Sequence, residues 1–208
     1  MSKIKDYAEA SMKRFNEKHD LSTFMDEEVY AQWLAQTYYF VRHSTTLLGY
    51  ALPHLKNEKL RRHFEHHLAE EEKHDLLLLK DLERLGRSID QFEESSFTTA
   101  FYHSQYYRIA FEGGTSMLGY ILFLECLATN WGKSCYTKIQ PTYPASTLFL
   151  KVHAEEDPHH VVEAIRTIEA LSSEEQDIIL KNLHYSEIIY DEIMRVAKAT
   201  RSTLNKAA

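Results

Sequence analysis

Turn-forming residues are scarce in this chain of 208 residues, which has only 6 glycines and 4 prolines. These two residue types make up roughly 12% of an average protein, about two and a half times their share here. Sandwiches and barrels of many short strands, collagen-like repeats and flexible linkers all depend on them, so each of these architectures is disfavoured. An internal repeat and a low-complexity tract are also missing, which predicts a single domain over residues 1–208.

Cysteines and long apolar runs are equally rare. Cys126 and Cys135 are too few for a disulfide framework and lack C-x-x-C spacing, so we expect two small buried side chains in a reducing compartment. The longest apolar run, at 117–124, is far shorter than the ~20 residues of a membrane helix. The N-terminal residues include no apolar stretch typical of a signal peptide. We therefore expect a cytoplasmic protein with no membrane partner.

Positive charge is in deficit, since 24 Lys and Arg residues face 31 Asp and Glu residues and the formal net charge is −7. A protein that binds nucleic acid must neutralise phosphates, so this balance argues against a nucleic-acid partner. Common catalytic motifs are missing too. Gly132-Lys133-Ser134 lacks the first glycine of a phosphate-binding loop, and neither G-x-G-x-x-G nor G-x-S-x-G occurs.

Helical periodicity of apolar residues extends along the chain, and no segment shows the alternation of a strand. We expect helices at 4–18, 26–53, 57–85, 96–111 and 115–138, and from about 145 and 172 onward. The start and stop signals are Asp26, Asn57, Gly86, and Ser172 paired with Glu175. Pro158 suggests a kink, with Asp157 as a new cap. The predicted fold class is all-α, an up-and-down bundle of six or seven helices.

Histidine is abundant, with 12 residues. The pattern H-x3-[D/E]-x2-H occurs twice, as His67, Glu71 and His74 and as His153, Asp157 and His160. Positions 0, 4 and 7 of a helix lie on one face, with the first and last ~10 Å apart along the axis. One small ion would suit both imidazoles poorly, whereas two ions ~3.5–4 Å apart would suit them well. The spacing therefore favours a dinuclear metal site.

Glu125 is the only charged residue between Gly113 and Trp131. An ionised carboxylate in so apolar a helix is costly unless it is paired or binds a metal. Because the two histidine patterns already indicate a metal site, we expect Glu125 to be a metal ligand. Imidazole and carboxylate ligands fit iron, manganese or zinc, and the lack of thiolates argues against structural zinc. We assign His63 and His66 to a solvated face. A ferritin-like centre fits less well, because no acidic residue lies between Val29 and Asn57.

These segments resemble the haem-oxygenase-like family of iron-containing redox enzymes, which share the TenA/PqqC-type helical fold and include dimetal oxidases and oxygenases that bind no haem. The matching segments are YYFVRHSTTLLGYA from residue 38, HLAEEEKHDLLLLKDLERLG at 67–86, LGYILFLE at 118–125 and HAEEDPHHV at 153–161. The resemblance implies a haem-oxygenase-like bundle whose metal ligands are Glu71, His74, Glu125, His153, Asp157 and His160. Some relatives have a carboxylate at the position of His67, so either His67 or Glu71 completes the site.

The resemblance further implies an iron-dependent oxidoreductase with two iron ions per chain, or iron with manganese. Such an enzyme activates O2 to oxidise, hydroxylate or cleave a small organic substrate, with electrons from an unidentified donor. Glu70 and Glu156 are candidates for supporting the ligands. Alternatives are a metal-free TenA/PqqC-like enzyme, a haem-binding oxygenase with His43 as ligand, and a non-catalytic helical interaction domain. A homodimer is compatible with each of them.

Overall fold

The structure, a computed structural model, describes residues 3–204, without the side chains of 155–159 and 200–204. Helices joined by short turns make up the described residues, and no strand occurs among them. The all-α prediction is therefore confirmed. No helix in the described part is both long enough and apolar enough to span a membrane.

The α-helices follow the predicted order along the chain. They are α1 (Lys3–Lys18), α2 (Glu27–Val41), α3 (Ser44–Ala51), α4 (Glu58–Glu70), α5 (His74–Arg84), α6 (Ser96–Glu112), α7 (Met117–Leu127), α8 (Lys133–Ile139), α9 (Leu148–Glu169) and α10 (Ser173–Leu204). Short 3-10 turns occur at Leu21–Met25, Leu52–His54, Ile89–Gln91 and Gly114–Ser116, and a π-helical turn at Ala128–Gly132 joins α7 to α8.

The predicted capping residues do begin these helices. The Asp26 carboxylate accepts hydrogen bonds from two backbone N–H groups at the start of α2, and the Asn57 side chain does the same for α4. Ser172 and Glu175 form the expected capping box before α10. Gly86 follows α5 with a positive φ of 73°, as a C-terminal glycine stop requires.

The single helix predicted over 57–85 is wrong, because the chain divides there into α4 and α5. Lys73, just before α5, has a φ of 73°, a left-handed conformation that costs a non-glycine residue roughly 1–2 kcal/mol. The sequence has no glycine or proline at this point to signal the break. As a result, Glu71 ends one helix while His74 begins the next.

Three other predicted helices differ in detail. The helix from residue 26 ends at Val41, and α3 follows after a two-residue turn. The helix over 115–138 contains the π-helical turn. The sixth helix begins at Leu148 and continues through Pro158, so the prediction that Asp157 caps a new helix is wrong.

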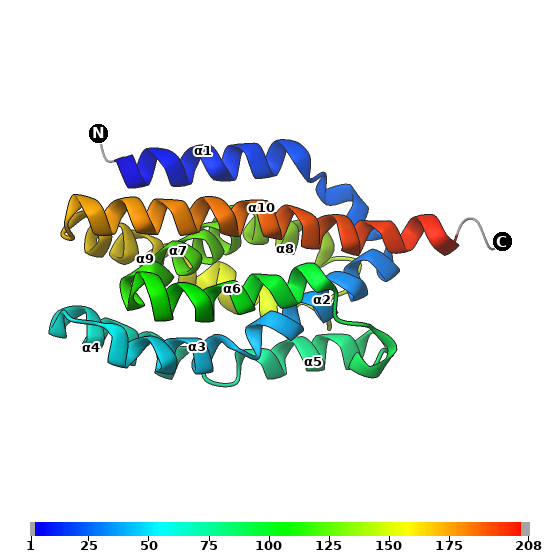
Figure 1. Cartoon of the computed structure of the whole chain (residues 1–208). Helices are drawn as coiled ribbons and strands as arrows, with labels where there is room; N and C mark the ends of the chain where they lie inside the picture. Colours follow the sequence, from blue (N-terminus) through cyan, green and yellow to red (C-terminus); the bar gives the residue numbers. More distant parts are fainter. Residues whose placement is uncertain (1–2, 205–208) are drawn as a thin grey trace.

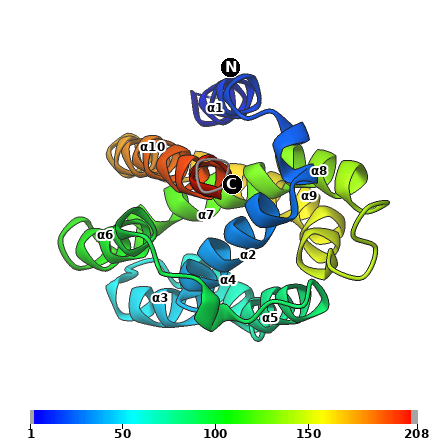
Figure 2. The same cartoon turned by 90° about the vertical axis from the view of Figure 1, so that its right-hand side faces the viewer.

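The helices pack around α2 and α7. The long α10 extends along the molecule with α1 on its outer side, while α3, α4 and α5 form the opposite side (Figure 1). Viewed end on, α2 crosses the interior, where it packs against α10, α5 and α6 (Figure 2). The apolar α7 packs between α10 and α9 and is buried at every position except Leu124.

A close crossing brings α7 and α10 together. A Cβ atom added at Gly119 would lie 2.2 Å from the backbone oxygen of Ile179. Only glycine therefore allows the two backbones to approach this closely, and the contact sets the depth of α7 in the bundle.

Candidate metal centre

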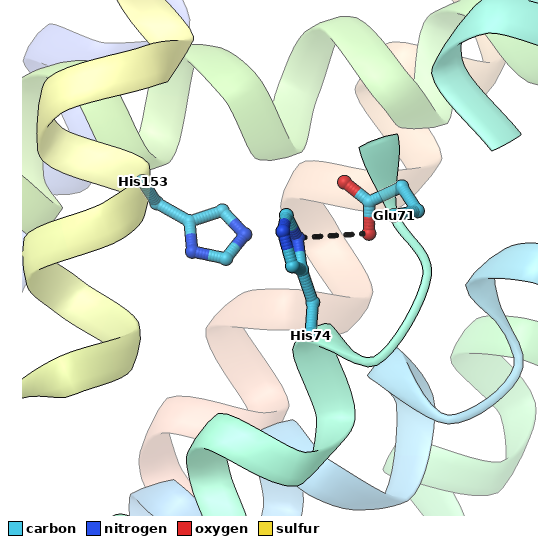
Figure 3. Close-up of side chains that lie close together, drawn as sticks. All are labelled: Glu71, His74 and His153. Atoms are coloured by element: carbon cyan, nitrogen blue, oxygen red, sulfur yellow. Dashed lines mark ion pairs between the residues drawn. The ribbon is translucent and has the colours of Figure 1, made fainter. Parts of the chain in front are cut away.

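The turn between α4 and α5 positions two of the predicted ligands. Glu71 and His74 lie on either side of the left-handed Lys73, and both side chains are largely buried. The Glu71 Oε2 atom lies 3.7 Å from Nδ1 of His74 (Figure 3). The break in the helix thus keeps the carboxylate and the imidazole directed at the same point.

His153 approaches this pair from α9. Its ring centroid lies 4.9 Å from that of His74, and the two rings meet edge to face, with an interplanar angle of 71° (Figure 3). Its Nδ1 atom donates a hydrogen bond of 2.9 Å to the carbonyl oxygen of Phe149, one turn earlier. A carbonyl only accepts, so the proton is on Nδ1 and the Nε2 atom carries the lone pair that a metal ligand needs.

Glu71, His74 and His153 form one compact donor set. Each offers a ligand atom, and these atoms all lie within 4.8 Å of one another. Donor atoms held ~2.1 Å from one ion are separated by about 3–4.2 Å, so small side-chain rotations suffice to close the set around a cation. Two imidazoles and one carboxylate are the ligands of many non-haem iron sites.

A buried carboxylate on α5 fixes the position of α9. Asp81 is fully buried, and its two oxygens accept hydrogen bonds of 2.9 Å each from the backbone N–H groups of Leu148 and Phe149. These groups begin α9, one turn before His153. Burial raises the pKa of Asp81 to about 6, although both hydrogen bonds act in the opposite direction. The contact holds the N-terminus of α9 against α5, which also carries His74.

Glu125 and His67 lie beside this set. Glu125, the only charged residue of the apolar helix α7, is 7% exposed, which agrees with the burial expected from its apolar neighbours in sequence. The His67 Nδ1 atom lies 3.6 Å from Glu125, and its Nε2 atom lies 3.6 Å from Glu71. His67 therefore stands between two carboxylates, while Glu71 belongs to the compact donor set. Both candidates for completing the site are present, in different positions.

His160 lies two helical turns after His153 on α9. Its ring centroid is 5.9 Å from that of His67, and its Nε2 atom is 3.6 Å from the Glu70 carboxylate. The side chains of Asp157 and Glu156 lie outside the described residues. The structure thus brings Glu71, His74 and His153 together, with Glu125, His67 and His160 as neighbours.

The carboxylate of Glu71 stays ionised in this environment. Burial opposes ionisation, but the imidazoles of His67 and His74 outweigh it and hold the pKa of Glu71 well below its usual range. A buried carboxylate among histidines presents a negative site to a cation.

An apolar cavity adjoins the histidines and carboxylates. Its volume is about 90 Å³, which is room for several water molecules or a small ligand at ~10–15 Å³ per water. The candidate ligands in its wall are His67, Glu71, Glu125, His153 and His160. Most of the remaining wall is apolar or aromatic and includes Trp33, Phe40, Tyr120, Trp131, Phe149 and Tyr190. Such a lining suits an apolar organic molecule.

Two donors in the cavity wall were not identified from the sequence. The hydroxyl of Tyr120 and the indole N–H of Trp131 are buried and have no hydrogen-bond partner in the described part of the chain. No sequence signal separates them from ordinary core aromatics. By contrast His43, the candidate haem ligand, stacks on Tyr102 with ring centroids 3.8 Å apart and does not line the cavity.

Solved structures with the same fold come from several organisms. A domain of unknown function from Shewanella denitrificans, described as having a heme oxygenase-like fold, is 19% identical with a TM-score of 0.81, over 99% of this chain and 93% of that one. A TenA homologue from Pyrococcus furiosus is 14% identical, with a TM-score of 0.73 over 92% and 99% of the two chains. A TenA homologue from Pseudomonas syringae is also 14% identical, with a TM-score of 0.75 over 93% and 90%.

At these identities the likeness establishes the haem-oxygenase-like fold. No curated protein matches the chain. A family model described as iron-containing redox enzyme matches residues 31–185, which include every candidate ligand.

Proposed function

Because the chain belongs to the iron-containing redox enzyme family, we propose that it is a non-haem oxidase or oxygenase with a dimetal centre. The centre would hold two iron ions, or iron with manganese. Its substrates would be O2 and a small apolar organic molecule, and it would draw electrons from an external donor. The observation that carries the proposal is the compact set of Glu71, His74 and His153, of which Glu71 and His153 line an apolar cavity.

The candidate ligands fall into two groups by their position, one group for each ion. Glu71, His74 and His153 would hold the first ion, for the reasons of distance given above. Glu125 and His160, with His67 between Glu71 and Glu125, would hold the second. Asp157 stays a predicted ligand, since it lies one turn from both histidines of α9 in sequence. Bound at these positions, the metal ions supply the redox chemistry that activates O2 towards the substrate.

The protein's own groups prepare the site. The Phe149 carbonyl holds the proton of His153 on Nδ1 and so orients Nε2 towards the centre. The aromatic wall excludes bulk water and positions an apolar substrate beside the ligands. The hydroxyl of Tyr120 and the N–H of Trp131 can each donate a hydrogen bond to an acceptor on that substrate.

A metal-free enzyme is the second candidate, because two of the similar structures are TenA homologues. Such an enzyme would keep its activity in a chelator, whereas the proposed oxidase would lose it. The haem-binding alternative is disfavoured by His43, whose ring is stacked on Tyr102 away from the cavity.

Metal analysis tests the proposal directly. Protein loaded with ferrous iron under anaerobic conditions and then desalted is expected to retain two iron ions per chain. His153→Ala should retain at most one, while His103→Ala, which removes an exposed histidine of α6, should match the parent. Retention of less than one iron per chain by the parent would contradict the proposal.

A further inference from the structure

Two side chains of α4 that the proposed centre does not use, His66 and Glu70, connect the surface with His160 on α9. The Glu70 Oε1 atom lies 3.2 Å from Nε2 of His66 and 3.6 Å from Nε2 of His160. The His66 side chain is 72% exposed, Glu70 is 34% exposed and His160 is 24% exposed. One carboxylate therefore contacts a histidine in solvent and a histidine of the cavity wall.

The series of possible metal-ligand side chains continues inward from His160. The His160 ring lies 5.9 Å from the ring of His67, and the two nitrogens of His67 face Glu71 and Glu125 at 3.6 Å each. The exposed fraction of the side chain falls to 10% at His67 and 8% at Glu125. Nitrogen and oxygen donors thus follow one another from solvent to the centre, each within a side-chain rotation of the next.

A second histidine–carboxylate pair, His63 and Glu163, also lies near His67. His63 Nδ1 lies 3.6 Å from the exposed carboxylate of Glu163 on α9, and the His63 ring lies 6.4 Å from His67. A solvated face explains the exposure of His66 but not the position of His63, whose Nε2 is buried and has no hydrogen-bond partner among the described residues. Both pairs converge on His67.

We propose that His66 and Glu70 form an outer capture site for a divalent first-row transition-metal ion, which then passes through His160 and His67 to the centre. This inference rests on the proposed function. A hydrated dication cannot cross an apolar cavity wall without a large desolvation cost. A series of imidazole and carboxylate donors replaces its water ligands one at a time, and these donors suit such ions.

The experiment measures Co²⁺ uptake by metal-free protein with the double variant His66→Ala/Glu70→Gln. Bound Co²⁺ is followed in a stopped-flow instrument by its visible absorption and by quenching of Trp33 and Trp131, which line the cavity. Release to excess chelator is measured in the same way. The matched control is Glu83→Gln/His103→Ala, which removes the same residue types from exposed positions on α5 and α6.

A capture site speeds uptake and release equally and leaves the equilibrium unchanged. We expect both rates to fall about tenfold or more in His66→Ala/Glu70→Gln, with unchanged Co²⁺ stoichiometry and Kd, and the control to match the parent. Unchanged rates would overturn the inference. A loss of stoichiometry would also overturn it, because the two residues would then belong to the centre itself. If the parent binds no Co²⁺, the proposed function fails, and that result is distinct from binding at unaltered rates.

Discussion

The contact between Asp81 and the start of α9 predicts an unusual dependence of stability on pH. The carboxyl is fully buried, and its pKa is raised to about 6 from an ordinary value of 3.8. The folded state therefore binds the proton more tightly than the unfolded state. The stabilisation from this proton is complete below about pH 4 and is lost as the pH rises through 6.

The magnitude follows from the shift. A difference of about two pH units, at roughly 1.4 kcal/mol per unit, corresponds to about 3 kcal/mol. Most of this contribution should disappear from the free energy of unfolding between pH 4 and pH 7. Asn at position 81 does not titrate and still offers one oxygen to the N–H groups of Leu148 and Phe149.

Urea unfolding of the parent and of Asp81→Asn at several pH values between 4 and 7 measures this effect. Other titrating groups are common to both proteins, so the difference between the two curves isolates Asp81. We expect the variant to gain about 2–3 kcal/mol relative to the parent as the pH rises from 4 to 7. Parallel curves would refute the reasoning that burial, rather than the two hydrogen bonds, dominates at this carboxyl.

Two backbone predictions concern the framework of the centre. Gly119→Ala should lower the free energy of unfolding by about 3 kcal/mol or more, because its Cβ would lie 2.2 Å from the Ile179 oxygen, and thermal unfolding followed by circular dichroism measures the loss. A melting temperature equal to that of the parent would contradict the close crossing. At Lys73, with its φ of 73°, Lys73→Val should cost about 1–2 kcal/mol while Lys73→Gly should be neutral or slightly stabilising. Equal stability of these two variants in urea would argue against a left-handed residue there.

Much of the fold could be predicted because its signals are local. Asp26, Asn57 and Ser172 cap helices through side-chain bonds to residues two or three positions away, and such bonds depend on little else. The apolar α7 is buried where its composition predicted it. The break at Lys73 and the π-helical turn have no comparable signal, because packing and not local preference produces them.

The candidate site, like the fold, could be predicted from the sequence only where the signals are local. Spacing within one helix predicted that His67, Glu71 and His74 share a face, and Glu71 does lie within 3.7 Å of both histidines despite the break. The partners across helices could not be predicted from spacing. Asp81 looks like an ordinary charged residue in sequence, and its role depends on where α9 begins. Likewise, the link from Glu70 to His160 exists only once the fold brings these two side chains of α4 and α9 together.

Anomalous scattering at the iron absorption edge, from crystals of protein loaded with ferrous iron, tests the central claim most directly. The account predicts two peaks inside the bundle, the first bound by Glu71, His74 and His153 and the second beside Glu125 and His160. Iron found only at exposed histidines such as His66, with no peak inside the bundle, would contradict it.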